Sequence, residues 1–180
     1  DGSGVTGAEI ALTDAAGRTY RLTADTTGAY GQAVPPGTYS ATATAYGYGS
    51  ANAANMTVTA NGTATANFTL TASAPVPPAA AAGLDAGEAK LSWPHVSPDT
   101  SYIVRRGVAP YFDPAAGATV ATIPAAHPPA ADETLAWRDA DSGVGDATVN
   151  HFYVVMGQNA AGVGAASNRM GEFDFALVKP

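Results

Sequence analysis

Short alternating segments separated by turn signals fill the first half of the chain, and they constrain the fold more than any other feature. The alternating stretches are AEIAL, RTYRLTAD, AYGQAV, TYSATATAYGY, MTVTA and ATANFTL. Apolar and polar side chains that alternate in this way have the period of a β strand. DAAG, TTG and PPG separate the stretches, and Asn-Gly before ATANFTL is typical of a hairpin turn. Because no window has a convincing helical period, we expect a small antiparallel sandwich of six strands.

A proline- and alanine-rich stretch divides the chain. TASAPVPPAAAAG has no alternation, and its two adjacent prolines cannot donate to a sheet ladder. Four acids and two bases precede this stretch, whereas eleven acids and six bases follow it. The sequence therefore predicts an all-β protein with two antiparallel β-sandwich domains in tandem, over residues 1–72 and 84–180, joined by a linker at residues 73–83.

Composition limits the environment and the partners of the chain. There are no cysteines, so disulfides and cysteine-based metal sites are excluded. The net charge of −7 argues against nucleic acid and against anionic membranes as partners. No apolar run approaches the roughly 18 residues of a membrane span, so membrane insertion is not expected. A Thr- and Gly-rich chain with few charges predicts an extracellular or cell-surface location, and the absence of an initiator Met predicts a mature or trimmed product.

Several marks of the first half occur together in one order. They are GVTGAEIAL, TADTTGAYG, VPPGTYSATATAYGY and TVTANGTATANFTL. With these marks, residues 1–71 resemble a carboxypeptidase regulatory-like domain, which is a transthyretin-type sandwich. Members of this family usually begin with one more strand, which reads like GxVxD, directly before the position of Asp1. The resemblance therefore implies a sandwich that lacks its first strand.

The second half resembles a fibronectin type III domain over residues 74–178. AKLSWPHV matches the strand with the buried tryptophan, here Trp93, and TSYIVRRG matches the next strand. HFYVVMGQNAAGVGAASN matches a later strand, with Tyr153 in the tyrosine position, and RMGEFDFALV would be the last strand. Both halves together look like modules from the C-terminal ends of large secreted bacterial proteins, including some peptidases.

Catalytic residues do not form a recognisable set in this sequence. His95, His127 and His151 are too far apart in the chain to suggest a metal site. The sequence around Ser50 is an incomplete G-x-S-x-G motif. We therefore expect a protein that is not an enzyme and that binds no cofactor.

Two weaker patterns are candidate sites. Asp139, Asp141 and Asp146 share one Gly-containing loop, which could hold Ca²⁺ or could be an acidic turn. The triplets NMT, NGT and NFT are acceptor patterns for N-glycosylation, with the acceptor residues Asn55, Asn61 and Asn67. Asn61 lies in the expected hairpin turn, where we expect its side chain to be exposed.

A sandwich without its first strand leaves backbone groups of the neighbouring strand without partners, and such edges recruit other strands. Two explanations stay open. The strand belongs to the natural protein and has been trimmed, or another chain supplies it, as in donor-strand assemblies. In the second case, a head-to-tail contact that does not close makes a fibre.

EFDFALV, near the C-terminus, is the best candidate for the donated strand. Phe173, Phe175 and Leu177 point one way along a strand, and the residues between them point the other way. Val5 and Ile10 are the predicted interface residues in the first domain. A long last strand of the second domain is the alternative explanation of EFDFALV, and residues around the proline-rich stretch are a second candidate donor.

These observations favour a non-catalytic extracellular structural subunit. It would polymerise with other copies into a filament or surface layer by β-strand complementation. One alternative is an accessory spacer or substrate-binding module of a larger secreted enzyme such as a peptidase. A third hypothesis is an adhesion module that binds a cell-surface glycan, with Tyr46 and Tyr48 as an aromatic platform.

Overall fold

The computed structural model describes residues 3–146 and 148–171, and every regular element within these ranges is a β strand. The chain divides into two compact units, Asp1–Ser73 (unit 1) and Ala74–Pro180 (unit 2). All strand pairs of the described residues are antiparallel, which confirms the predicted all-β sandwich class. The two units are treated separately below.

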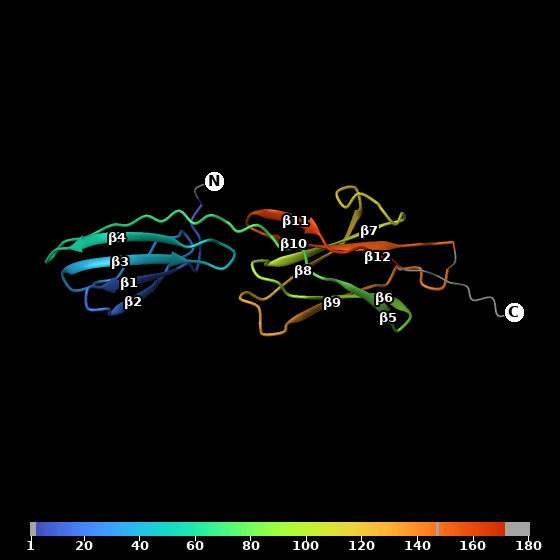
Figure 1. The fold of residues 1–180 in the computed structure, drawn as a ribbon, viewed down its shortest axis with the longest axis horizontal. Coiled ribbons are helices and arrows are strands. Elements are labelled where there is room, and N and C mark those ends of the chain that lie inside the picture. Colours follow the sequence, from blue (N-terminus) through green and yellow to red (C-terminus); the bar gives the residue numbers. More distant parts are fainter. Residues whose placement is uncertain (1–2, 147, 172–180) are drawn as a thin grey trace. The chain divides into compact units, whose positions relative to one another are not determined.

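Unit 1 contains one sheet with the strand order β2-β1-β3-β4 (Figure 1). Its strands are β1 (Glu9–Asp14), β2 (Thr19–Thr23), β3 (Gly37–Thr44) and β4 (Ala51–Val58). The DAAG turn joins β1 to β2 because the Asp14 Oδ1 atom accepts hydrogen bonds from the backbone N–H groups of Ala16 and Arg18, both at 2.9 Å. These bonds, with the one from Arg18 strongest, hold the pKa of Asp14 below its usual value.

One face of this sheet forms the core of unit 1. Ile10, Ala41 and Ala43 are buried on that face. Phe68 and Leu70 pack against them from outside the sheet. The core therefore has two layers, one of which is the hydrogen-bonded sheet and the other a set of connecting segments.

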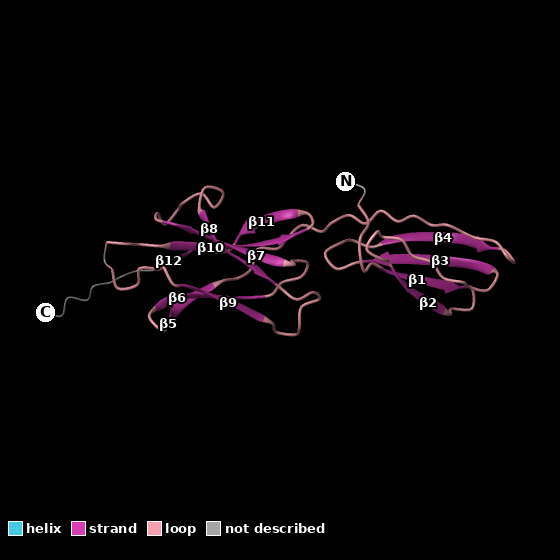
Figure 2. Ribbon diagram, turned by 180° about the vertical axis from the view of Figure 1, so that it is seen from behind, coloured by secondary structure: helices cyan, strands magenta, loops and turns pink. Residues whose placement is uncertain are grey.

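The second layer of unit 1 differs from the prediction. AYGQAV and ATANFTL were expected to be strands, yet neither joins a ladder in the described part of unit 1. The Asn-Gly turn does form, with Gly62 N donating to Thr59 O at 3.0 Å and Asn61 at a φ of 56°. The chain after it crosses to the other layer instead of pairing with β4, so no hairpin results. Figure 2 shows this connection, between β4 and β5, as a long loop.

Unit 2 contains two sheets that enclose a core. The first has the order β5-β6-β9, and the second the order β11-β10-β7-β8, with β12 paired to β10. The strands of the first sheet are β5 (Ala81–Asp85), β6 (Glu88–Pro94) and β9 (Thr134–Asp139). Those of the second are β7 (Ser101–Gly107), β8 (Ala118–Pro124), β10 (Phe152–Asn159), β11 (Gly162–Ala166) and β12 (Met170–Gly171).

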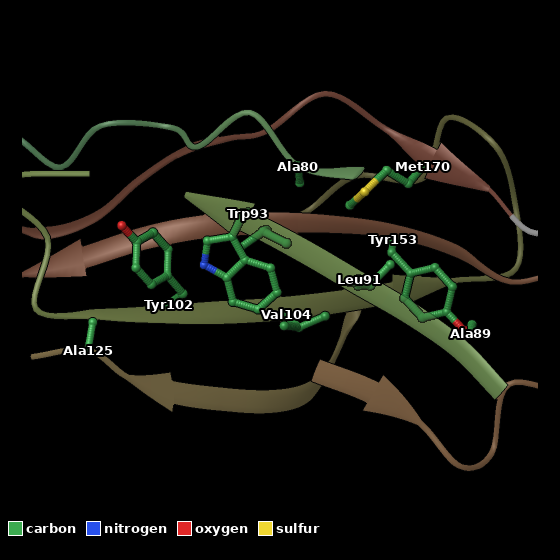
Figure 3. Close-up of a cluster of buried hydrophobic side chains, with 10 residues drawn as sticks. Ala80, Ala89, Leu91, Trp93, Tyr102, Val104, Ala125, Tyr153 and Met170 are labelled. Atoms are coloured by element: carbon green, nitrogen blue, oxygen red, sulfur yellow. The ribbon is translucent and has the colours of Figure 1, made fainter. Parts of the chain in front are cut away.

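The core of unit 2 lies between its two sheets. Alternate residues of β6 and β7 point inward, and Leu91, Trp93, Tyr102 and Val104 are at most 1% exposed. Figure 3 shows the indole of Trp93 beside the ring of Tyr102, with their centroids 5.7 Å apart. The buried tryptophan of AKLSWPHV is therefore the centre of a conventional two-sheet core.

The proline-rich stretch is held more firmly than a free linker. Asn168 donates to Ala80 O at 2.8 Å and accepts from Ala80 N at 3.0 Å. Val76 N donates to the buried carboxyl of Asp99 at 3.1 Å. Because β5 begins at Ala81, the predicted linker of residues 73–83 extends too far into unit 2.

Candidate functional site

A groove of about 840 Å³ lies in unit 1. Its apolar floor includes Leu12, Leu22, Tyr39 and Met56, which belong to all four strands of the sheet. Its other lining residues come mainly from residues 28–34 and 58–67, which are the connecting segments of the second layer. The groove therefore lies over the core face of the sheet, between two stretches of extended chain. Leu12 and Met56 in its floor are half-buried, and Leu22 and Tyr39 are buried.

The first of these stretches starts at a rigid turn. Asp25 Oδ1 accepts hydrogen bonds from Thr27 Oγ1 at 2.7 Å, Thr27 N at 2.8 Å and Ala29 N at 3.0 Å. These bonds, led by the one from the Thr27 side chain, lower the pKa of Asp25. Gly28 lies at a φ of 81°, and a Cβ atom there would be only 2.7 Å from the Cα of Gly4. TTG therefore fixes where the chain enters the groove wall.

The second stretch has the burial pattern of a strand without a partner strand. From Thr63 to Leu70, exposed and half-buried residues alternate without interruption. The inward row is Ala64, Ala66, Phe68 and Leu70, and the outward row is Thr63, Thr65, Asn67 and Thr69. The alternation of ATANFTL thus reports correctly which side chains face the core.

Backbone–backbone hydrogen bonds are missing from the larger part of each stretch. Within the described ranges, the N–H groups of residues 31–34 and 63–70 donate to no backbone carbonyl. A side chain bridges the two stretches instead, because Tyr30 Oη donates to Ala66 O at 2.5 Å. The rings of Tyr30 and Phe68 lie 6.3 Å apart between centroids, and burial raises the pKa of Tyr30. The side chain of Tyr30 thus connects the two stretches, where two paired strands would instead be connected by backbone N–H···O bonds.

This arrangement can bind an extended peptide. Apart from Ala66 O, which accepts from Tyr30, the backbone groups of residues 31–34 and 63–70 form no hydrogen bond among the described residues, and the floor between them is apolar. A strand inserted there could form ladders on both sides and bury alternate side chains. Each backbone hydrogen bond gained in exchange for water contributes a net of about 0.5–1.5 kcal/mol.

The predicted interface residues of the first domain lie elsewhere. Ile10 is 1% exposed in the core, and Val5 packs half-buried against that core. β1 has partners on both sides, β2 and β3, so its backbone offers no open edge. Val5 and Ile10 do not line the groove, and their role as interface residues stays a prediction. The predicted donor residues Phe173, Phe175 and Leu177 lie outside the described residues.

The three aspartates of the candidate Ca²⁺ loop are not brought together as ligands. Asp139 is buried, and its Oδ2 atom accepts from Arg106 Nη1 at 2.7 Å and from Tyr153 Oη at 2.8 Å. Asp141 meets Asp139 only through its backbone N–H, at 3.1 Å, and Asp146 caps a local turn. In residues 3–146 and 148–171, no three His, Cys, Asp or Glu side chains group closely enough to hold a metal ion.

The three glycosylation candidates are all exposed. Asn55 forms a bulge in β4 at a φ of 58°, and Asn61 lies in the turn before the second groove stretch. Asn67 belongs to the outward row of that stretch. All three side chains are therefore accessible, and their glycosylation stays a prediction.

Tyr46 and Tyr48 are half-buried in a loop that is tied to the end of unit 1. Tyr48 forms a β-bridge with Ala72, and Gly47 O accepts from Ser73 N at 2.8 Å. These contacts favour a structural role for the two tyrosines over that of an open aromatic platform.

The histidines occupy separate places in unit 2. His95 is buried, with Nδ1 at 3.0 Å from Tyr102 Oη and Nε2 at 2.7 Å from Ala126 O. His127 is exposed, and His151 is half-buried beside the ring of Tyr153. No helix in the described part of the chain is long and apolar enough to span a membrane.

Comparison with known proteins gives one family match. The carboxypeptidase regulatory-like domain matches residues 1–71, which confirms the resemblance of the first half. A search of curated proteins finds no match. The fibronectin type III resemblance of the second half stays a prediction.

Among solved structures, one similar fold is a "putative carbohydrate binding protein" from Bacteroides uniformis, at 9% identity and a TM-score of 0.40, covering 95% of this chain and 90% of that one. Another is the FN1-FN3 region of chicken CNTN1, at 16% identity and a TM-score of 0.39. That match covers 94% of this chain, which spans 54% of the CNTN1 structure.

Proposed function

We propose that this chain is a non-catalytic extracellular structural subunit whose copies assemble into a filament or surface layer by sharing β strands. The observation that supports this proposal is the second layer of unit 1. Two extended stretches there contribute to the core and line an apolar groove, but residues 31–34 and 63–70 within them form no backbone–backbone hydrogen bonds among the described residues. Exposed backbone edges of this kind bind additional strands.

The test is the association state of the full chain and the protection of its groove. Sedimentation velocity and electron micrographs over a range of concentrations should show larger species that grow with concentration. Amide exchange at residues 31–34 and 63–70 should slow as these species form. Amides of β10 serve as the internal control because their pairing does not depend on assembly. A chain that stays monomeric at every concentration contradicts the proposal.

A second candidate is supported by the family match at residues 1–71. On this hypothesis the chain is an accessory spacer or substrate-binding module of a larger secreted enzyme, such as a peptidase. The sequence of the gene upstream of Asp1 tests it directly. A peptidase domain in the same reading frame supports the accessory module, and its absence favours the self-assembling subunit.

A further inference from the structure

We propose that the groove of unit 1 takes Glu172–Val178 of a second copy of this chain as an inserted strand. This inference rests on the proposed function and names the partner of the same site. The groove is formed by described residues. For the inserted segment, only the amino-acid sequence is used.

The groove suits a strand with large apolar side chains on one face. Its walls contribute small side chains, since Ala64 and Ala66 point inward on one side and Ala29, Gly31 and Ala33 lie on the other. Beneath these small residues, Leu12 and Met56 of the floor are half-buried, and Leu22 and Tyr39 are buried. A strand that enters here is expected to fill the space with its own bulky side chains.

The sequence of the proposed insert supplies such a face. Phe173, Phe175 and Leu177 occupy alternate positions, and Glu172 and Asp174 fall on the opposite face. Seven residues are enough for a strand of typical length. In the proposed complex the two phenyl rings and the leucine lie over the apolar floor, and the two carboxylates face water.

Charge does not oppose this arrangement. Like charges that face each other across paired strands are destabilising. AYGQAV and TATANFTL contain no charged residue, so neither stretch would place a carboxylate beside Glu172 or Asp174. The opposing side chains on the outward row are threonines and Asn67.

The length of the C-terminal segment favours a second copy over the same chain as the source of the inserted strand. Gly171 pairs with Phe152, at the start of β10, whereas Val76 lies against Gly157, near the end of β10. These points are about 17 Å apart along the strand. The residues after Gly171 extend to at most about 30 Å, and a strand of six residues alone needs about 20 Å. Along the path of β10, the residues after Gly171 are therefore too few to pass Val76 and also form a strand of six residues.

The experiment uses two full-length variants, one that can only accept a strand in its groove and one that can only donate its C-terminal strand. An acceptor-only chain carries Phe173→Ser, Phe175→Ser and Leu177→Ser, and keeps the groove. A donor-only chain carries Ala64→Phe, which fills the groove from its wall without breaking a strand pair. Neither variant should assemble alone. Mixed in equal amounts, they should form a dimer and go no further, as measured by sedimentation velocity.

A matched variant and a peptide provide the controls. The chain with Glu172→Ser and Asp174→Ser changes only the outward face of the insert, so it should assemble like the unmodified chain. A synthetic peptide of residues 172–178 in excess should stop growth of the unmodified chain. The same peptide with serine at the three apolar positions should bind at least about a thousandfold more weakly, because burial of each of the three side chains contributes a factor of about ten or more.

The peptide also keeps the test decisive if Ala64→Phe does not fold. Assembly of the unmodified chain that neither the peptide nor the tail substitutions reduce overturns this inference and leaves the proposed function standing. A monomeric unmodified chain overturns both. Groove amides that are protected in a monomer place an occupant from the same chain there, and this result also overturns the inference.

Discussion

The two units of this chain use backbone hydrogen bonds differently to cover an apolar face. In unit 2 the core lies between two sheets, and strands supply both layers. Among the described residues of unit 1, a single sheet supplies one layer, and the other consists of extended segments that have side chains in the core but no ladder. The comparison shows that burial of side chains and pairing of strands are separable properties of a β-rich chain.

This separation has a consequence for what each unit can do. A layer whose backbone is already paired has no capacity for a further strand, except at its edges. A layer that is packed but unpaired has that capacity along its whole length, at the cost of lower local stability. Unit 1 therefore combines a paired sheet with a layer whose backbone is largely unpaired, whereas both layers of unit 2 are paired sheets.

Amide exchange should show the largest difference between the layers. In a dilute monomeric sample, amides of residues 31–34 and 63–70 should exchange about a thousandfold faster than those of β3, which has partners on both sides. The reason is that paired amides exchange only when the sheet opens. Residue-resolved NMR measures both sets in one sample, with β10 as the reference in unit 2. Equal protection of both sets would mean that the second layer has a ladder after all.

Removal of one aromatic ring from each core should destabilise unit 2 more than unit 1. Trp93→Ala should cost unit 2 about 3–5 kcal/mol of unfolding free energy, because the indole is 1% exposed and enclosed by two sheets. Phe68→Ala should cost unit 1 only about 1 kcal/mol, because the ring is half-buried in the unpaired layer. Denaturant unfolding followed by NMR signals of each unit measures both values.

Each of these variants also controls the other, since the substituted unit alone should lose stability. A loss for Phe68→Ala as large as that for Trp93→Ala would indicate a second layer packed as tightly as the core of unit 2.

Alternation along the chain predicted burial well and pairing less well. AEIAL and TYSATATAYGY both contain strands, and TATANFTL alternates between exposed and half-buried side chains. Alternation, however, reports only which face of an extended segment meets the core, and it does not identify a neighbour for the backbone. The Asn-Gly turn formed as expected, but the chain after it crossed to the other layer.

Contacts between distant residues were also beyond prediction from a single sequence. Asp139 looked like part of an acidic loop, but it is the buried partner of Arg106 on β7. Asp99, in a loop after the proline of SPDT, holds the start of unit 2 through Val76. Nothing in the local sequence around either aspartate indicates these partners, because the fold brings them together from far along the chain.

The smallest expected effect is the pH dependence of the stability of unit 2. Burial raises the pKa of Asp99, while the hydrogen bond from Val76 and the charge of His95 partly oppose this. A carboxyl whose pKa is higher in the folded state favours folding when it is protonated. The stability that Asp99 contributes to unit 2 should therefore fall as the pH rises from the ordinary value of 3.8 through the raised folded value, and level off above it.

Asp99→Asn isolates this contribution, because the amide oxygen can still accept from Val76 N but the group cannot ionise. The variant should lose the slope above pH 3.8 in denaturant unfolding of unit 2, while unit 1 is unchanged. Asp146→Asn is the matched control. The hydroxyl of Thr148 lowers the pKa of Asp146, so its contribution is present above pH 3.8 and is lost only at lower pH. If Asp99→Asn keeps the slope of stability against pH, another group in unit 2 causes it. Ionisation of the Asp99 carboxyl would then not destabilise unit 2.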